Sequence, residues 1–345
     1  MKIFCLVMMF LGTINLYATP KDDFINAAKS GDLDTLEAAL KAGVSANVTV
    51  QSWWGMGDRT MTALMFASEL GHTEIVRRLI RARANVRIRE YKGGGHDALG
   101  LAVRNGHLEI VKLLLPAKPD LNASQGQVPG DDRDPTALML ATWNGHVEIA
   151  QLLIANGAKV NARDPRGYTA LMFAEKPEII NLLLAKKANL EAKTKDGDTP
   201  LIVASRARKE ALSLLIGVNA NINARNKQGK TALHEAIVFG CTDCADLLIA
   251  AGADVNTADQ DGKTPLMESI EKEIHIATLL RKTSNDRNVT EYKMEIKRYT
   301  ETVKRLIEAK ADVNAKDKHG VSVLLYATKG ENQEIIRILR NAGAI

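Results

Sequence analysis

The sequence predicts an all-α protein built from one helix-turn-helix unit that is repeated along the chain. The main observation is self-similarity, because segments that read like TALMLATWNGHVEIAQLLI recur with a period of about 33 residues, as in solenoids. Only 4% of the residues are aromatic, whereas large β-sandwich and barrel cores are rich in aromatic and β-branched residues. A chain of 345 residues is also longer than one compact core usually is.

Each unit contains the signals of two short helices. A Thr or Ser precedes the first helix as its N-cap, and Pro200 and Pro265 fall in a first turn, where the missing N–H costs nothing. Leu and Ala recur at helical spacing on its buried face, and a second helix with its own apolar stripe follows. We expect the first helix to end at a left-handed glycine in several units, namely Gly71, Gly106, Gly145 and Gly240.

These motifs carry a family resemblance. One segment recurs at 62–80, 97–115, 136–154, 169–184, 199–216 and 231–249, and tails such as AGADVNTAD at 251 recur as well. These segments resemble the TPLHxA, GHxEIVxLLL and GADVNA elements of the ankyrin repeat family. The resemblance implies a solenoid of about nine repeats, with finger loops, over residues 19–345. It also implies that a protein partner binds the concave face, which finger tips and first helices form.

Several repeats depart from the pattern. The GH turn is missing after Ala174 and the connection after Ala204 is short, so we expect shortened helices in the fifth and sixth repeats. Insertions lie at 48–59, at 124–135 and in the eighth repeat, at about 281–305. The last insertion predicts two long antiparallel helices joined near 283–287, with Asn288 and Glu291 as a capping box.

Residues 1–18 read as a secretory signal peptide. One Lys precedes an apolar run from Ile3 to Leu11, and the small residue Ala18 closes the segment. That run is too short to span a bilayer, which needs about 20 residues, and no other stretch approaches this length. We therefore expect export, to the periplasm or the outside of the cell, and no membrane span.

The remaining chemistry is sparse. Cys241 and Cys244 form a CxxC at the start of a helix, which leaves open a disulfide, a pair of packed thiols or a redox-active pair. No GxSxG, Walker, GxGxxG or HExxH motif occurs, and the histidines lack metal-ligand spacing. We therefore expect no enzymatic activity, no cofactor and no metal.

The charge pattern names no partner by itself. The net charge of +5 is mild, and one basic cluster, from Arg77 to Lys92, reads as a solvated face or as a site for an acidic partner or membrane surface. Nucleic acid is disfavoured because the chain lacks a basic groove interleaved with aromatic residues.

Large aromatic and basic side chains fall on the expected concave face. Exposed Trp, Tyr and Arg anchor many protein interfaces, although the tryptophans could instead pack against their own loops. We therefore predict a monomeric protein-binding module; the alternatives are a thiol-redox helper and a secreted effector or adhesin that contacts a host protein. The predicted binding residues are Trp53, Trp54, Arg59, Leu70, Arg104, Trp143, Tyr168 and Phe239.

Overall fold

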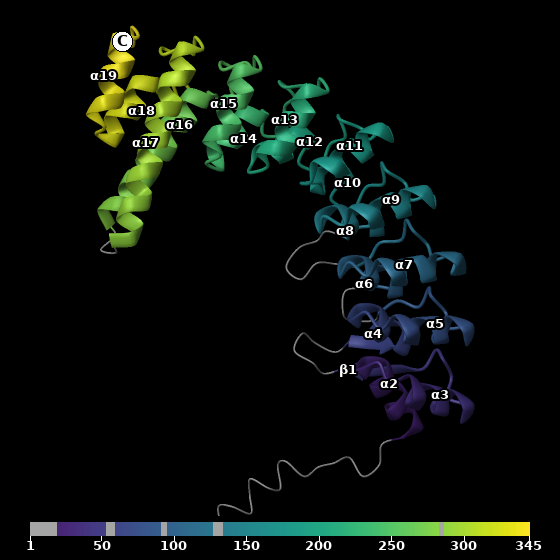
Figure 1. Ribbon diagram of the computed structural model, residues 1–345. Coiled ribbons are helices and arrows are strands. Elements are labelled where there is room, and N and C mark those ends of the chain that lie inside the picture. Colours follow the sequence, from purple (N-terminus) through teal and green to yellow (C-terminus); the bar gives the residue numbers. More distant parts are fainter. Residues whose placement is uncertain (1–18, 53–58, 91–94, 127–133, 283–285) are drawn as a thin grey trace, which may run out of the picture. The chain divides into compact units, whose positions relative to one another are not determined.

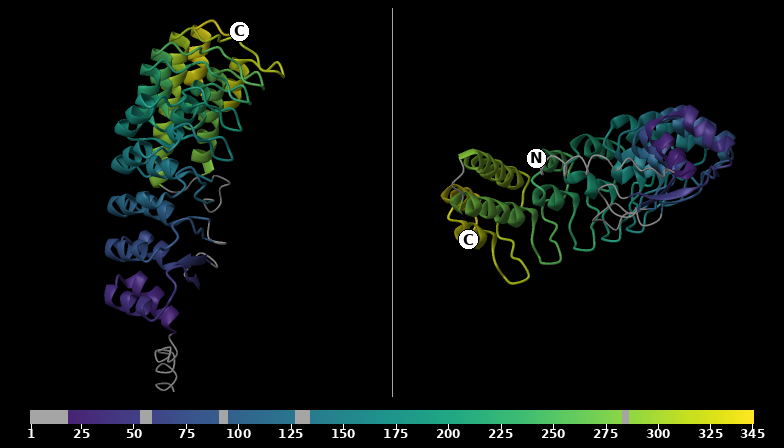
Figure 2. Two further views of the ribbon diagram at one scale, coloured as in Figure 1. Left: turned by 90° about the vertical axis from the view of Figure 1, so that its right-hand side faces the viewer. Right: turned by 90° about the horizontal axis from the view of Figure 1, so that it is seen from below.

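The computed structural model describes residues 19–52, 59–90, 95–126, 134–282 and 286–345 (Figure 1). The chain divides into two compact units, Met1–Pro165 and Arg166–Ile345, which are described separately. In both units the helices come in antiparallel pairs joined by short turns, and an extended finger leads from one pair to the next (Figure 2). None of the described helices is both long and apolar enough to cross a membrane.

The first unit is a two-layered stack of helix pairs. The first helices α2, α4, α6 and α8 pack on one another in chain order, and the second helices α3, α5, α7 and α9 form a parallel row. The bounds are α2 Pro20–Ser30, α3 Leu33–Lys41, α4 Ala63–Leu70, α5 Thr73–Arg81, α6 Ala98–Arg104, α7 Leu108–Leu114 with a 3-10 turn at Leu115–Ala117, α8 Ala137–Trp143 and α9 Val147–Ala155.

The predicted glycine turns are present, and Gly71 shows why a glycine is needed. Its φ of +85° lies in the left-handed region, and a Cβ there would stand 2.8 Å from the ring of His107 in the next repeat. That ring uses its Nε2–H to donate to the carbonyl oxygen of Glu69, at 3.1 Å. The turn therefore both ends α4 and forms a contact with the following repeat.

A small β-hairpin interrupts the otherwise helical first unit. Strands β1 (Thr49–Ser52) and β2 (Arg59–Thr62) pair antiparallel with Val50 opposite Met61. The all-α prediction omitted this hairpin. Its strands are rich in Thr and Val, β-branched residues that favour extended backbone, and Met61 anchors it in the core with no exposed surface.

The second unit repeats the two-layered arrangement. The row α10, α12, α14, α16 and α18 packs in chain order, and α11, α13, α15, α17 and α19 form the second row. The bounds are α10 Ala170–Phe173, α11 Pro177–Ala185, α12 Pro200–Ser205, α13 Lys209–Gly217, α14 Ala232–Val238, α15 Thr242–Ala250, α16 Pro265–Lys282, α17 Asp286–Glu308, α18 Val323–Gly330 and α19 Gln333–Asn341.

The helices α10 and α12 are short, as the missing turn residues predicted. Helix α10 has 4 residues, and Ala174 after it is extended with ψ at 129°, so no glycine turn forms there. Arg208 reaches back from the next repeat to the carbonyl oxygen of Met172 and to Glu175, at 3.2 Å from its carboxylate. An arginine from the neighbouring repeat therefore contacts the chain where the turn is missing.

We expect the amides of α10 to exchange hydrogen fastest among the first helices of the second unit. A helix of 4 residues leaves most of its amides without intrahelical partners, whereas α14 has 7 residues and a complete glycine turn. Hydrogen exchange followed by mass spectrometry of the native protein would measure this. Equal protection of α10 and α14 would contradict it.

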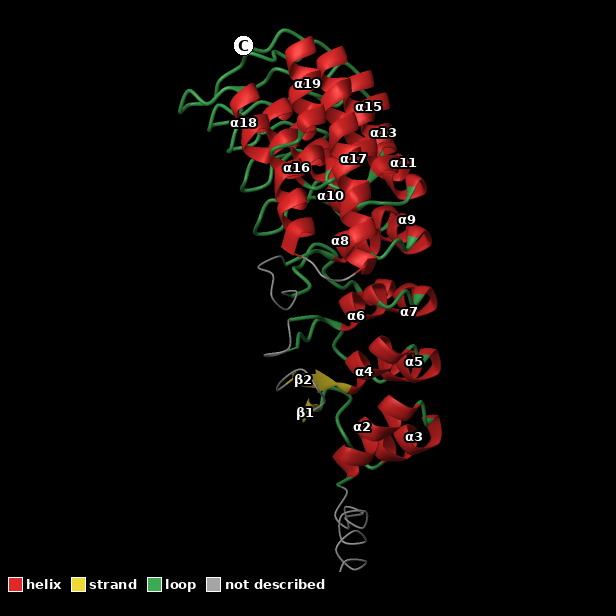
Figure 3. Ribbon diagram, turned by 90° about the vertical axis from the view of Figure 1, so that its left-hand side faces the viewer, coloured by secondary structure: helices red, strands yellow, loops and turns green. Residues whose placement is uncertain are grey.

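The long helices α16 and α17 run antiparallel, and their far ends extend beyond the neighbouring helices (Figure 3). Helix α17 already begins at Asp286, so the expected capping box at Asn288 and Glu291 was wrong: both residues lie inside the helix. At the near end Tyr299 is buried, and its hydroxyl donates to the carbonyl oxygen of Ile237 at 3.3 Å. The pair therefore docks on α14 through its base.

Candidate protein-binding face

The predicted binding residues of the first unit follow one another along the ends of its first helices. Leu70 ends α4 and is 51% exposed, Arg104 ends α6 and is exposed, and Trp143 ends α8 and is half-buried. Because α4, α6 and α8 pack side by side, the three residues lie along the same end of the row. Trp53 and Trp54 lie outside the described residues, and Arg59 is placed only as the first residue of β2.

The two remaining predicted residues, Phe239 and Tyr168, lie in the second unit and differ in how exposed their rings are. Phe239, directly after α14, is 57% exposed, and the guanidinium of Arg206 lies 5.1 Å from the centre of its ring. Tyr168 is half-buried, with its ring stacked on Phe173 at 5.5 Å between centroids and packed against a cluster that includes Met172. Phe239 therefore offers a partner a large apolar surface, whereas Tyr168 contributes mainly to packing.

Arg206 is a residue of this face that the sequence interpretation missed. It follows the short helix α12, where its Nη2 lies 2.6 Å from Asp198 Oδ2 and its Nε lies 2.8 Å from Glu235 Oε2. Partial burial disfavours its charge, but the two carboxylates outweigh this effect and raise the pKa of Arg206. The available signal was its position before the turn, which matches that of Arg104; the short connection after Ala204 obscured it.

The fingers of the second unit are tied to one another at their tips. The amide of Lys227 donates to the carbonyl oxygen of Asp196 at 2.8 Å, and the amide of Gln260 donates to that of Gln228 at 2.9 Å. Gly197 permits this approach, because a Cβ on it would stand 2.8 Å from the nitrogen of Lys227. The finger loops therefore project side by side as one hydrogen-bonded array (Figure 2).

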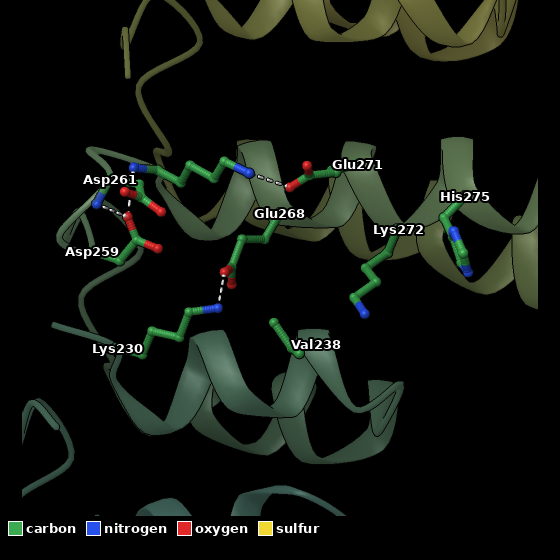
Figure 4. Close-up of a pocket in the computed structure, with 9 residues that line it drawn as sticks. Lys230, Val238, Asp259, Asp261, Glu268, Glu271, Lys272 and His275 are labelled. Atoms are coloured by element: carbon green, nitrogen blue, oxygen red, sulfur yellow. Dashed lines mark hydrogen bonds and ion pairs between the residues drawn. The ribbon is translucent and has the colours of Figure 1, made fainter. Parts of the chain in front are cut away.

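A polar pocket of about 360 Å³ lies between α14, α16 and the finger at 259–263 (Figure 4). On its inner side Lys230 Nζ donates to Glu268 Oε1 at 2.5 Å, and the Glu268 side chain is nearly inaccessible to solvent. Burial outweighs the bond from Lys230 and raises the pKa of Glu268 to about 7. Figure 4 shows Val238, Lys272 and His275 farther along the pocket.

We expect Glu268 to destabilise the protein as the pH rises from about 5 to about 8, by about 2–3 kcal/mol. Between its ordinary pKa of 4.5 and about 7, the native carboxyl holds a proton that the unfolded chain has lost, so unfolding becomes easier with increasing pH. The measurement is urea unfolding of the wild type and of Glu268→Gln across this range. A constant difference between the two proteins would contradict the expectation.

Cys241 and Cys244 are joined by a disulfide bond at the start of α15. Cys241 takes the position of the turn histidine, and Cys244 is completely buried. Cys241 is half-buried, so its sulfur is the one that an external thiolate could reach, whereas Cys244 is enclosed in the packing of α15.

The described residues offer no metal centre, since no group of three or more His, Cys, Asp or Glu side chains among them could hold a metal ion. The turn histidines have another role. His72 and His146, like His107, donate from Nε2 to backbone carbonyl oxygens of the preceding repeat, those of Lys29 at 2.9 Å and Arg104 at 3.4 Å.

Several arginines of the basic cluster at 77–92 bond to groups of this chain. Arg78 pairs with Glu37 at 3.1 Å, and Arg87 donates through Nε and Nη2 to the carbonyl oxygen of Lys118 at 3.2 and 2.9 Å. Arg89 donates to the carbonyl oxygen of Gly95 at 2.8 Å and, in the next repeat, to that of Ser124. These arginines connect neighbouring repeats, which leaves less of their charge for an acidic partner.

In each unit the stacked helix pairs and their fingers define a helical repeat protein. A family model for ankyrin repeats in three copies matches residues 24–125, 121–194, 174–259 and 201–291. The chain therefore belongs to the ankyrin repeat family, and its repeats make it a protein–protein interaction module.

The curated relatives share the repeats. The chain is 38% identical to Ankyrin repeat and SOCS box protein 3 of Bos taurus over 185 residues, which are 52% of this chain and 33% of that protein. It is 30% identical to Putative ankyrin repeat protein YahD of Escherichia coli K12 over 199 residues, 53% of this chain and 88% of that protein. The chain thus spans about a third of the Bos taurus protein, whose remaining parts lie outside the match.

Proposed function

We propose that this protein binds a protein partner through the ends of its first helices and its fingers. The observation that carries the proposal is Phe239, whose ring is 57% exposed beside Arg206, while Asp198 and Glu235 hold that arginine in place. Exposed aromatic and arginine side chains in a fixed geometry are the residue types that anchor interfaces. In the first unit, Leu70, Arg104 and Trp143 supply the corresponding surface.

We further infer that the chain forms about nine repeats. We also infer that the protein acts as a monomer and has no catalytic activity. The number of repeats is supported by the succession of helix pairs along the described residues, from α2–α3 to α18–α19, in which α16–α17 is the elongated eighth pair. The elongated pair makes a second, separate surface around Met294, which is 52% exposed.

The experiment is capture of binding proteins by immobilised wild-type protein, Phe239→Ala and Met294→Ala, followed by quantitative mass spectrometry. We expect a specific partner to be depleted at least about 10-fold with Phe239→Ala, since a hot spot contributes about 2 kcal/mol or more. Met294→Ala is the matched control, because it removes an equally exposed apolar side chain from the elongated pair. Loss of the partner with Met294→Ala alone would contradict the proposal.

We also propose that the protein works after export, with residues 1–18 removed. Two features support this: Thr19, directly after the proposed cut, caps the first described helix, and a disulfide suits an oxidising compartment. Cell fractionation with N-terminal sequencing would test it. A chain that keeps Met1 in the cytosol would contradict it, whereas release into the medium would favour the effector or adhesin alternative.

The thiol-redox alternative makes a different prediction. A double substitution of Cys241 and Cys244 by Ser would abolish a redox activity while leaving partner capture unchanged. Under the binding proposal no thiol-dependent activity exists, and capture by the double variant still depends on Phe239.

A further inference from the structure

The inner side of the pocket contains a carboxylate oxygen that lacks a partner. Glu268 is 4% exposed, and its Oε1 accepts a hydrogen bond from Lys230. Its Oε2 is buried and has no hydrogen-bond partner within the part of the chain that the structure describes. Leaving a buried carboxylate oxygen unsatisfied is costly, so this atom marks a place where a donor is missing.

The charges around Glu268 also leave room for a cation. Among the described residues, Lys230 is the ammonium group that bonds to Glu268, and it is also attracted by Asp259, whereas Glu235 is paired with Arg206. The pocket carboxylates nearer the surface have their own cations: Glu271 pairs with Lys263 at 2.6 Å and Asp261 pairs with Lys318. The inner side of the pocket therefore carries more negative than positive charge.

We propose that this pocket receives an arginine side chain of the protein partner, whose guanidinium donates to Glu268 Oε2. The proposal rests on the proposed function and specifies the chemistry of the partner at one position. A guanidinium fits because its planar fork of donors can bond to a carboxylate while Lys230 keeps the other oxygen. Because Oε2 is buried, the guanidinium reaches it only after Glu268 rotates about its terminal torsion, which is broad in glutamate.

The position of the pocket matches the proposed binding face. Its volume of about 360 Å³ lies at the lower end of the range for ligand sites, and Val238 provides an apolar wall for the methylene groups of an arginine. Val238 ends α14 and Phe239 follows it, so the pocket and the exposed ring lie at the same end of α14, the pocket toward α16 and the ring beside Arg206. Lys272 and His275, toward the other end in Figure 4, disfavour a second cation there.

The test uses N-acetyl-arginine amide as the probe, titrated at about pH 8, where Glu268 is ionised, into the whole protein with the methyl groups of valine isotopically labelled for NMR. We expect the Val238 signals to shift with a dissociation constant in the range of about 1–10 mM, as is typical of a single side chain without the rest of its partner. Neutral N-acetyl-citrulline amide, which has nearly the same shape, should bind at least about 5-fold more weakly.

Substitutions separate Glu268 from its neighbours. Glu268→Gln should raise the dissociation constant of the arginine probe at least about 5-fold. Glu271→Gln is the same exchange three residues along α16, and it should change that constant less than about 2-fold. Glu268→Asp retains the charge and should preserve part of the affinity, which controls for a fold disturbed by the Gln variant. Probe binding is measured without the partner, so failure of the binding-face proposal is distinguishable from failure of this one.

Three results would overturn the inference. They are the absence of a Val238 shift with the arginine probe up to about 50 mM, equal affinity for the citrulline probe, and a stronger response to N-acetyl-glutamate amide. The last result would show that Lys272 and His275 make the pocket a site for an anion.

Discussion

Leu138→Ala in α8 is expected to lower the free energy of unfolding by about 2–5 kcal/mol, the usual cost of truncating a fully buried leucine. Leu138 is 1% exposed and lies in a helix that packs against both α6 and α9. In a repeat protein each unit is stabilised by its neighbours, so the loss should spread beyond α8 and also raise amide exchange in α6.

Urea unfolding measures the change, and Leu70→Ala is its matched control. Leu70 is the same residue at the end of a first helix of the same unit but is 51% exposed, so its truncation should cost less than about 0.5 kcal/mol. Similar costs for the two substitutions would show that burial in α8 does not determine stability as the structure indicates.

Arg206→Met is expected to destabilise the second unit by about 3–5 kcal/mol, because it leaves two buried carboxylates without their cation. Asp198 and Glu235 are both buried, and Arg206 bonds to each at 2.8 Å or less. Arg104→Met is the control, because it removes an exposed arginine from the corresponding position of the first unit and should cost less than about 0.5 kcal/mol.

A triple variant tests the cause of that loss. If uncompensated charge is responsible, adding Asp198→Asn and Glu235→Gln to Arg206→Met should recover most of the stability, because neutral side chains need no cation. A triple variant as unstable as the single one would show that packing of the arginine stem, rather than its charge, stabilises the unit.

Much of the fold could be predicted from the residues because its signals are local. The period of Leu and Ala, the Thr caps and the glycine turns act within one helix or one turn, and the structure shows Gly71 in the predicted left-handed conformation. The shortening of α10 followed in the same way from turn residues missing after Ala174. The resemblance of these repeated motifs to ankyrin repeats was confirmed by the family match.

The parts that the sequence left undecided depend on residues far apart in the chain. The sequence predicted an insertion at 48–59 but not the pairing of β1 with β2, and α17 runs through Asn288 instead of being capped there. The charged pairs of the candidate site also join residues that are distant in the sequence. Arg206 meets Glu235 from the next repeat, 29 residues on, and Glu268 meets Lys230 from the preceding one, 38 residues back.

By itself, the sequence determined the repeating unit of this protein, because a helix, its cap and its turn are each specified within a few neighbouring residues. It also identified Leu70, Arg104 and Phe239 as residues at the ends of first helices. Only the tertiary structure decided which charges become buried, since burial arises when one repeat covers the next. That is why the paired Arg206, the raised pKa of Glu268 and its unpartnered oxygen became visible only in the folded chain.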